Sequence, residues 1–282
     1  MSAAPLVPEI LVDDSATEAE ARDFLLIDRI GAAYALADLD GEAESAHWWL
    51  ARRAERPIAA VLVVDSLPFR PTFAMGDVAG IGEILAGLRE TRVVFSAPIN
   101  SRPFIEAVYR FERVDRMYRM AVTRRTFTPS SRHTVTRLGE AHLDDIIELY
   151  GHVSRSYFTP ERVEREIYYG IYAGRTLAAA AGTHTRTTRS DLAAVGNVLT
   201  RPAWRGQGLA TAVTSAVTEA AVAEYRDVVL NVRQDNAPAV AVYLRLGYAI
   251  HSPYLEGPAA RRAGWERITK KLFGANDGGN QR

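Results

Sequence analysis

The spacing of apolar residues predicts a helix just past the middle of the chain. In the segment 141–153 they recur at intervals of three and four, the pattern of one face of an amphipathic helix. Those positions are Leu143, Ile146, Ile147, Tyr150 and Val153. We therefore expect one side of this helix to pack against the rest of the protein.

A second short helix and three strands are predicted to follow. Thr159 and Pro160 have the residue types of a helix N-cap and a first helical position, and this helix is expected to run through the sequence ERVEREIYY. Apolar runs then occupy 170–175, 176–186 and 192–200, with breaks at Gly, Thr and an Arg-Ser-Asp triplet. This pattern favours adjacent antiparallel strands.

A strand, a long helix and another strand are predicted around residue 209. The stretch from Leu209 to about Tyr225 has helical propensity and no Gly or Pro, and the run DVVLNV after it has β propensity. Asn236 can cap a further helix, and Gly247 is placed to end it in left-handed backbone. One face of that helix is expected to carry Ala239, Val242, Tyr243 and Leu246.

A polar, proline-containing segment at 123–137 separates two patterned halves. A chain of 282 residues, 48% of them apolar, is long enough for two cores of ordinary domain size. We place the boundary near Ser130, which gives one domain over 1–130 and a second over 131–273. The last segment, 274–282, lacks apolar periodicity and is expected to be a disordered tail.

Composition narrows the classes of partner. Lys plus Arg and Asp plus Glu both number 34, so no overall basic field attracts nucleic acid or an anionic membrane. Cysteine is absent and the six histidines show no His-x-x-x-His spacing, so no metal is expected in catalysis. The N-terminal residues turn acidic where a signal peptide is basic and then apolar, which indicates a cytoplasmic protein. Whether it forms a homo-oligomer is left open.

The junction before the long helix has the chemistry of an anion site. Its sequence, NVLTRPAWRGQGLATAV, places Arg205, Gly206 and Gly208 directly before the helix. The first amides of a helix lack intrahelical acceptors, and the helix dipole favours an anion there. Glycine lets the backbone approach phosphate oxygens closely, and arginine adds a positive charge. A diphosphate would fit this turn.

Neither common nucleotide-binding loop matches this turn. A dinucleotide fingerprint needs Gly or Ala where this chain has Thr211, and the lysine of a P-loop is missing. Residues 205–210 instead resemble the cofactor signature Arg/Gln-x-x-Gly-x-Gly/Ala of the GCN5-related N-acetyltransferase (GNAT) family. The segment NAPAVAVYLRLGY at 236–248 resembles the second signature of that family, an Asn, a Tyr seven residues later and a Leu-Gly-aromatic end.

The GNAT resemblance implies an α+β fold in which helices flank a mixed, mostly antiparallel central sheet. It also implies direct transfer of an acyl group, usually acetyl, from coenzyme A to an amine in a ternary complex. Strand residues would bind the pantetheine arm, the glycine turn would hold the pyrophosphate, and Tyr243 would be the general acid for the departing thiolate. The implied cofactor-binding residues are Val198, Leu199, Thr200, Arg205, Gly206, Gln207, Gly208, Leu209, Ala210, Thr211 and Asn236.

Each of these residues also has a plain structural interpretation. Glycines at a strand-to-helix junction can simply permit close packing. Asn236 can be no more than a helix cap. Tyr243 can be a core residue, although a buried hydroxyl usually seeks a polar partner. Two signatures in the expected order favour the functional interpretation.

The general base is not evident from the sequence. Many members of the family that this chain resembles carry a glutamate on one of the strands flanking the cofactor, whereas one of these strands has Asn231 here and the other has no acidic residue. His184 and Glu256 are the candidate bases from neighbouring strands. An isolated histidine is more often structural, and a water chain to bulk solvent could also take the proton.

The first half of the sequence is weakly similar to the second. The sequence VVFSAPINSRPFIEAVYRF from Val93 shares Val-Val, Asn, Pro and Ala-Val-Tyr with VVLNVRQDNAPAVAVYLRL from Val228. We interpret this as a tandem of two GNAT-like domains. The first is expected to be degenerate and non-catalytic, because its loop has no Arg or Gln before the glycines and carries Asp77 and Glu83, which would repel a diphosphate.

The sequence therefore predicts an acyl-CoA-dependent N-acyltransferase with acetyl-CoA as donor and a small-molecule or peptide amine as acceptor. The main alternative is a catalytically silent acyl-CoA-binding or regulatory module, which the missing base keeps open. A Rossmann-type nucleotide-binding domain is a further alternative, but Glu224, near the position of its ribose ligand, falls within the predicted helix.

Overall fold

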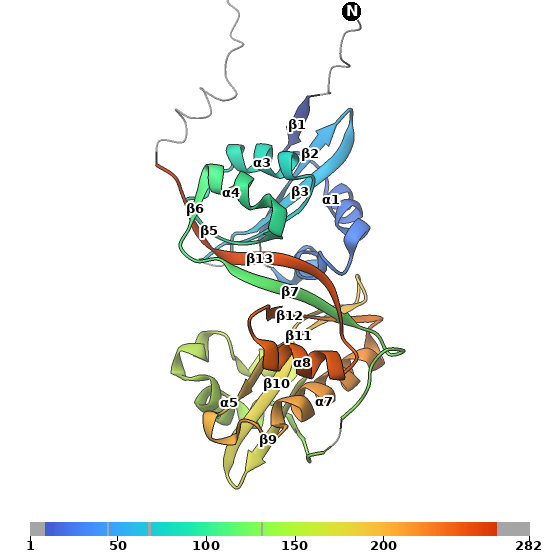
Figure 1. Ribbon diagram of the computed structural model, residues 1–282, viewed down its shortest axis with the longest axis vertical. Helices are drawn as coiled ribbons and strands as arrows, with labels where there is room; N and C mark the ends of the chain where they lie inside the picture. Colours follow the sequence, from blue (N-terminus) through green and yellow to red (C-terminus); the bar gives the residue numbers. More distant parts are fainter. Residues whose placement is uncertain (1–8, 44, 67–68, 131, 264–282) are drawn as a thin grey trace, which may run out of the picture. The chain divides into compact units, whose positions relative to one another are not determined.

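The computed structural model describes residues 9–43, 45–66, 69–130 and 132–263 (Figure 1). The chain divides into two compact units, each assembled from segments that are distant in sequence. Unit 1 comprises Met1–Ile27, Ala43–Arg116 and Tyr254–Arg282, and unit 2 comprises Asp28–Glu42 and Met117–Pro253. The predicted tail at 274–282 lies outside the described residues.

Unit 2 contains a mixed sheet with strand order β8, β9, β10, β11, β12, β7, in which only β11 and β12 are parallel. The strand bounds are β7 (Asp115–Val122), β8 (Thr136–Leu138), β9 (Tyr168–Ala173), β10 (Thr176–Thr187), β11 (Leu192–Thr200) and β12 (Asp227–Arg233). The predicted antiparallel strands are thus confirmed as β9, β10 and β11.

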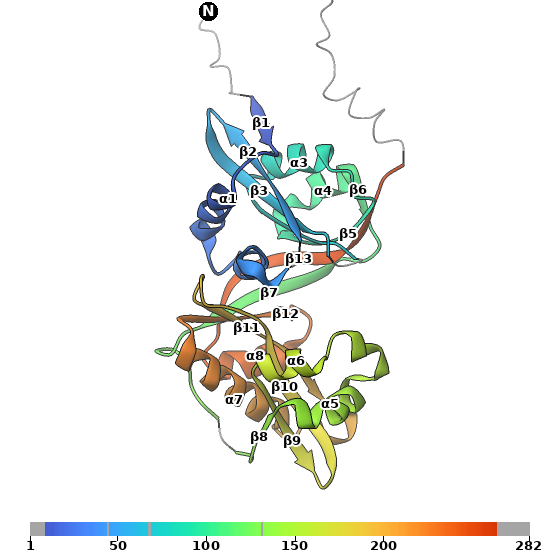
Figure 2. The same ribbon diagram turned by 180° about the vertical axis from the view of Figure 1, so that it is seen from behind.

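Helices cover both faces of this sheet (Figure 2). Their bounds are α2 (Ala33–Ala37), α5 (Leu143–Tyr150), α6 (Pro160–Arg165), α7 (Leu209–Glu224) and α8 (Ala237–Arg245). Side chains of α7 pack with Ala179 and Ala181 of β10, whereas those of α5 and α6 pack with Ala180 between them. This alternation follows from the period of two in a strand, which points successive side chains to opposite faces.

Two predicted helices are shorter than expected. α5 ends at Tyr150 because Gly151 leaves helical backbone with φ of +92°, so the helix stops before its predicted end at residue 153. α6 begins as predicted, with the Thr159 hydroxyl accepting the Arg162 N–H at 3.2 Å, but it ends at Arg165. The residues from Tyr168 onward pair with β10, so strand pairing overrides the helical pattern there.

Unit 1 repeats this architecture. Its strand order is β1, β2, β3, β4, β5, β13, with β6 also paired to β13, and only β4 and β5 are parallel. The strands are β1 (Ile10–Asp13), β2 (Ala46–Arg53), β3 (Arg56–Val64), β4 (Pro71–Gly76), β5 (Arg92–Pro98), β6 (Tyr109–Phe111) and β13 (Ala249–Arg261). The helices are α1 (Glu18–Leu25), α3 (Val78–Gly87) and α4 (Arg102–Val108).

The weak sequence similarity between the two halves corresponds to a structural repeat. In unit 1 the chain runs β4, α3, β5, α4, and in unit 2 it runs β11, α7, β12, α8, with a parallel strand pair in each case. The matched sequences from Val93 and Val228 fall on β5 and β12 and on the helices that follow them. The predicted fold class, α+β with a mixed, mostly antiparallel sheet flanked by helices in each of two domains, is thereby confirmed.

The compact units divide the chain differently from the predicted boundary at Ser130. β7 precedes that boundary but pairs with β12, with Met120 opposite Leu230. β13 follows it but pairs with β5, with Leu255 opposite Ala97. A change in composition along the chain marks a linker, but it does not reveal strands that pair with partners distant in sequence.

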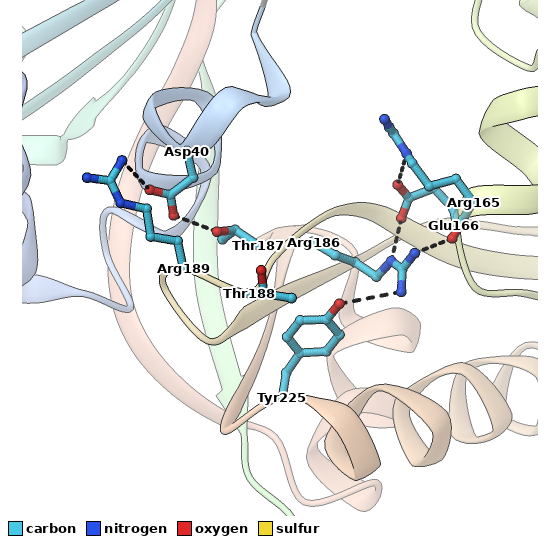
Figure 3. Close-up of a pocket in the computed structure, with 8 residues that line it drawn as sticks. All are labelled: Asp40, Arg165, Glu166, Arg186, Thr187, Thr188, Arg189 and Tyr225. Carbon is cyan, nitrogen blue, oxygen red and sulfur yellow. Dashed lines mark hydrogen bonds and ion pairs between the residues drawn. The ribbon is translucent and has the colours of Figure 1, made fainter.

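The segment 28–42 comes from the N-terminal part of the chain but belongs to unit 2. Arg29 forms an ion pair with Asp227 and donates to the Ser190 carbonyl at 2.7 Å. The Asp40 side chain, only 2% exposed, accepts hydrogen bonds from Thr187 and Ser190. Figure 3 shows this carboxylate between Thr187 and Arg189 at the turn that joins β10 and β11.

We expect Asp40→Ala to loosen the segment 28–42, because the hydroxyls that Asp40 accepts would lose their partner. Loss of such a buried group costs about 1–3 kcal/mol, so amide hydrogen exchange in peptides covering 28–42 should be roughly 5- to 150-fold faster. Glu219→Ala, at an exposed position of α7, is the control and should leave this exchange unchanged. Equal exchange in Asp40→Ala and the wild type would contradict this anchoring role.

Candidate active site

The parallel strands β11 and β12 stop pairing before either strand ends. Their register ends with Val195 opposite Leu230, yet β11 continues along β10 to Thr200 and β12 continues along β7 to Arg233. At this point Asn197 has left-handed backbone, with φ of +52°, and the register with β10 shifts. This is a β-bulge, which bends its strand and changes the direction of the edge. The β12-facing edge of 196–200 is thus available for pairing with another extended chain.

The same strand leads into a turn at the N-terminus of α7. Gly206 and Gly208 have φ of +77° and +81°, which explains why glycine occupies both positions. Gly208 is the N-cap residue and supplies no side chain to the first amides of the helix. Arg205 is exposed, and its Nε donates to the Thr200 carbonyl at 3.3 Å. An uncapped helix start beside a guanidinium is suited to an anion.

The corresponding helix start in unit 1 already contains an anion. Asp77 caps α3, and its Oδ1 accepts the backbone N–H groups of Ala79 and Gly80, both at 3.0 Å. Gly80 and Gly82 lie inside α3 and not in the turn before it. The amides that would contact a phosphate in this copy are therefore taken by the protein's own carboxylate.

Helix α8 places the residues of the second signature. Asn236 is exposed and caps the helix, its Oδ1 accepting the Ala239 N–H at 3.3 Å. Tyr243 is buried, with 7% exposure, in the apolar cluster that also contains Leu209. Val198 packs against the same cluster, so β11, the turn and α8 converge. Burial raises the pKa of Tyr243 to about 12, so its hydroxyl keeps its proton at neutral pH.

His184 lies beside the bulge, and a Cβ added to Gly196 would be 3.2 Å from the His184 Cβ. Its Nδ1 is 2.9 Å from the Tyr157 hydroxyl, and the two rings are stacked at 5.8 Å between centroids. Burial, and next the charge of Arg162, lower the pKa of His184 to about 4. His184 is therefore neutral at physiological pH.

Glu256 and Asn231, the other two positions considered for a general base, lie on strands β13 and β12. Glu256 lies on β13 in unit 1, where its backbone is opposite Ser96. Asn231 lies on β12, opposite Arg119 of β7, just beyond the last residue paired with β11. The Asn231 Oδ1 is buried and has no hydrogen-bond partner among the described residues.

The pocket drawn in Figure 3 lies at the opposite end of β11 from the glycine turn. Its volume is about 180 Å³, and its lining residues are Asp40, Arg165, Glu166, Arg186, Thr187, Thr188, Arg189 and Tyr225. The buried Glu166 carboxylate pairs with Arg165 at 3.0 Å and Arg186 at 3.1 Å. These ion pairs connect the end of β10 to the segment between α6 and β9, which is a structural role.

Several residues around His184 were not anticipated from the sequence. Tyr34, on the segment 28–42, has its ring 5.6 Å from that of His184, and the Arg119 guanidinium lies 4.6 Å over the Tyr34 ring. Tyr157 follows α5 and contacts the same histidine. The one available signal was the Gly-Asn pair at 196–197, because glycine inside a strand pattern is typical of a bulge.

The described residues contain no group of three or more His, Cys, Asp or Glu side chains arranged to hold a metal ion. Within 9–43, 45–66, 69–130 and 132–263, no helix has the length and apolar content needed to span a membrane.

Comparison with known proteins points to the GNAT fold. Residues 168–254 match the family model for FR47-like protein, a segment that contains β9 to α8 and both predicted signatures. A search of curated proteins found no match.

Solved structures resemble the chain over most of its length. A GCN5-related N-acetyltransferase from Sphaerobacter thermophilus aligns with a TM-score of 0.60 and 17% identity, over 91% of this chain and 98% of that one. A GCN5-related N-acetyltransferase from Kribbella flavida aligns with a TM-score of 0.58 and 16% identity, over 83% of this chain and 96% of that one. A tandem GNAT protein from the clavulanic acid biosynthesis pathway aligns with a TM-score of 0.53 and 14% identity, over 90% of this chain and 98% of that one. At these identities the likeness establishes the fold.

His184 should make stability depend on pH. Its folded pKa of about 4 lies below the ordinary value of 6.5, so between these values the unfolded chain binds more protons and the free energy of unfolding falls as pH falls. The loss between pH 7 and pH 4 should be on the order of 1–3 kcal/mol. His184→Gln should reduce this slope in urea titrations. Above pH 7 the two curves should run parallel, and equal slopes below pH 7 would contradict the assignment.

Proposed function

We propose that the protein transfers an acyl group, with acetyl as the simplest case, from a coenzyme A thioester to an amine. The observation that carries this proposal is the continuity of two features in unit 2. The unpaired edge of β11 after Val195 leads directly into the uncapped N-terminus of α7. An extended amide chain ending in a diphosphate is complementary to such a surface, and coenzyme A has that chemistry.

In this proposal the donor lies along β11 and ends at α7. The pantetheine amides pair with backbone groups of 198–200, as an added strand would. The pyrophosphate accepts N–H groups from the turn and first helical residues, 206–211, and Arg205 supplies a positive charge. Because the phosphates lie at the end of β11, the thioester reaches back to the bulge at Asn197.

The chemistry needs one bond formed and one broken. The neutral amine nitrogen attacks the thioester carbon, the carbon–sulfur bond breaks, and the electron pair leaves on sulfur. Tyr243 is the proposed general acid, because burial keeps its O–H protonated and it lies on the helix that packs against β11 and α7. No hydrogen bond of this hydroxyl to another described residue is present, which leaves it able to donate to sulfur.

The amine must also lose a proton when the amide forms. Of the two candidate bases, Glu256 accepts a hydrogen bond from the Tyr254 hydroxyl at 3.4 Å, and His184 has its Nδ1 engaged with Tyr157. We therefore assign the proton to solvent, which requires that the acceptor binds as the free amine. An acceptor whose ammonium group has a low pKa would satisfy this requirement at neutral pH.

Unit 1 is proposed to be non-catalytic. Its helix α3 has the same place in the fold as α7, but the Asp77 carboxylate occupies the amides at its start. A diphosphate there would have to displace a bound anion and face its charge. One coenzyme A per chain is the expected stoichiometry.

The function is tested by incubating the protein with acetyl-CoA and a panel of amines, amino acids and peptides, and measuring release of free thiol. Calorimetric titration with acetyl-CoA in parallel reports binding. Amine-dependent thiol release supports acyl transfer. Binding without release from any amine would instead indicate the silent acyl-CoA-binding module.

Gly208→Val should weaken acetyl-CoA binding. A β-branched side chain is strained at φ of +81°, and it would stand where the pyrophosphate approaches the backbone. The dissociation constant should rise at least about tenfold, or about 1.4 kcal/mol. Gly87→Val, at an exposed position with open space around it, is the matched control and should bind normally. A folded Gly208→Val protein with wild-type affinity would mean that the turn is only structural.

Tyr243→Phe should slow the chemical step and spare binding. Loss of a positioned general acid typically costs about 10²–10⁴ in rate, while the ring still fills the core. Single-turnover measurement at saturating acetyl-CoA isolates that step from product release. Tyr248→Phe is the control, since its ring lies 6.0 Å from that of Tyr243 but its hydroxyl bonds to Thr218. An unchanged rate in Tyr243→Phe would show that this residue is core packing alone.

A further inference from the structure

The protonation of His184 can be worked out from the hydrogen bonds around Tyr157. The Tyr157 oxygen is 3.2 Å from Nη2 of Arg162 and 3.1 Å from Nδ2 of Asn197, and both of these groups donate to it. The third neighbour is Nδ1 of His184, at 2.9 Å. A phenol oxygen accepts at most two hydrogen bonds and donates one.

Two donors therefore fill the acceptor sites of Tyr157, and its own O–H points to His184. The histidine Nδ1 must then carry the lone pair, which places the ring proton of the neutral imidazole on Nε2. Protonation of Nδ1 would remove this bond and aim a third donor at the phenol oxygen. The geometry thus fixes one tautomer and opposes the imidazolium form.

Of the two charged groups that act on His184, Arg162 opposes its protonation and Glu166 favours it. The Arg162 guanidinium lies 4.2 Å over the Tyr157 ring and donates to the His184 carbonyl at 2.7 Å. Glu166 has the opposite influence on the histidine, but it is itself paired with Arg165 and Arg186. The Tyr34 ring, from the segment 28–42, is tilted by 46° to the His184 ring at 5.6 Å between centroids.

Asn197 couples this network to the cofactor edge. It is the bulge residue of β11, its Nδ2 also donates to Tyr168 at 3.0 Å, and its carbonyl accepts from Tyr150. The His184 Cβ lies 3.2 Å from where a Cβ on Gly196 would stand, at the position where β11 leaves β12. With the donor along β11 as proposed above, the thioester carbonyl reaches this position.

We propose that His184 serves the acyl-transfer centre as a neutral hydrogen-bond donor through Nε2–H, with Tyr157 as its positioning residue, and that it is not the base. This rests on the proposed function. When the amine attacks, the carbonyl π electrons move to oxygen, and Nε2–H donates to that oxygen without transferring its proton. The oxygen electron pair then re-forms the carbonyl π bond as the carbon–sulfur bond breaks and its electron pair leaves on sulfur, so His184 is unchanged over the cycle.

The tautomer is tested in the full-length protein without substrate. Nitrogen-15 spectra of histidine-labelled protein, with His184→Gln to assign the signals, should show Nδ1 unprotonated and Nε2 protonated from pH 8 down to about 5. Tyr157→Phe removes the donor to Nδ1, so it should mix the two tautomers and raise the pH at which His184 titrates. A proton on Nδ1 in the wild type would mean that the Asn197 amide is reversed, and it would overturn the proposal.

The role is tested with an amine that releases thiol in the screen. Glutamine keeps an N–H donor but cannot act as a base, so His184→Gln should retain single-turnover activity within about tenfold, whereas His184→Ala should lose about 10²–10³-fold. Equal losses in the two variants would overturn the proposal. Absence of thiol release from the wild type with every amine would overturn the proposed function and the role at its centre, and the nitrogen spectra would still decide the tautomer.

Discussion

The early separation of β11 from β12 is the constraint on which the candidate site depends. A parallel pair that continued to Thr200 would consume the backbone groups proposed to hold the pantetheine arm. The bulge at Asn197 ends that pairing, and it is held by contacts on both sides, the carbonyl to Tyr150 and the amide to Tyr157 and Tyr168. A non-glycine residue with positive φ is costly, and it persists where its surroundings fix it. The side chains of Tyr150, Tyr157 and Tyr168 thus support the proposed cofactor edge, although they do not belong to either signature.

The two units differ at one residue that, in the proposed function, separates a binding copy from a structural one. Both present the N-terminus of a helix after a strand of a parallel pair, so both have the same unsatisfied amides. In unit 1 Asp77 satisfies them from within the chain, which stabilises the helix and removes the anion site. In unit 2 Gly208 leaves them open, which gives up the stability of a side-chain cap. The fold is the same, and the difference lies in which anion the helix start accepts.

Most of the local structure could be predicted from the sequence, but little of how distant segments pack together. Helix starts at Thr159 and Asn236, the left-handed end at Gly247 and the strand-turn-helix at Gly208 all follow from residue type and spacing. The boundary at Ser130 does not match the compact units, because strand pairing between distant segments leaves no compositional trace. The environment of His184 could not be predicted from the sequence for the same reason. It is formed by residues from three separate segments, including Tyr34, and a single sequence does not show that they meet.

This environment changes what a histidine beside the proposed acyl-transfer site implies. An isolated histidine in a sequence suggests a base, since its ordinary pKa lies near neutrality. Here the base function would need the Nδ1 lone pair, which Tyr157 occupies, or a second tautomer that Arg162 and Asn197 disfavour by filling the phenol oxygen. What remains is a donor whose charge does not change across the physiological pH range. A transition state that gathers negative charge on a carbonyl oxygen is stabilised by such a fixed dipole, because the dipole needs no reorganisation when the charge appears. The pH dependence of the reaction would then come from the acceptor amine and the solvent, and not from the histidine.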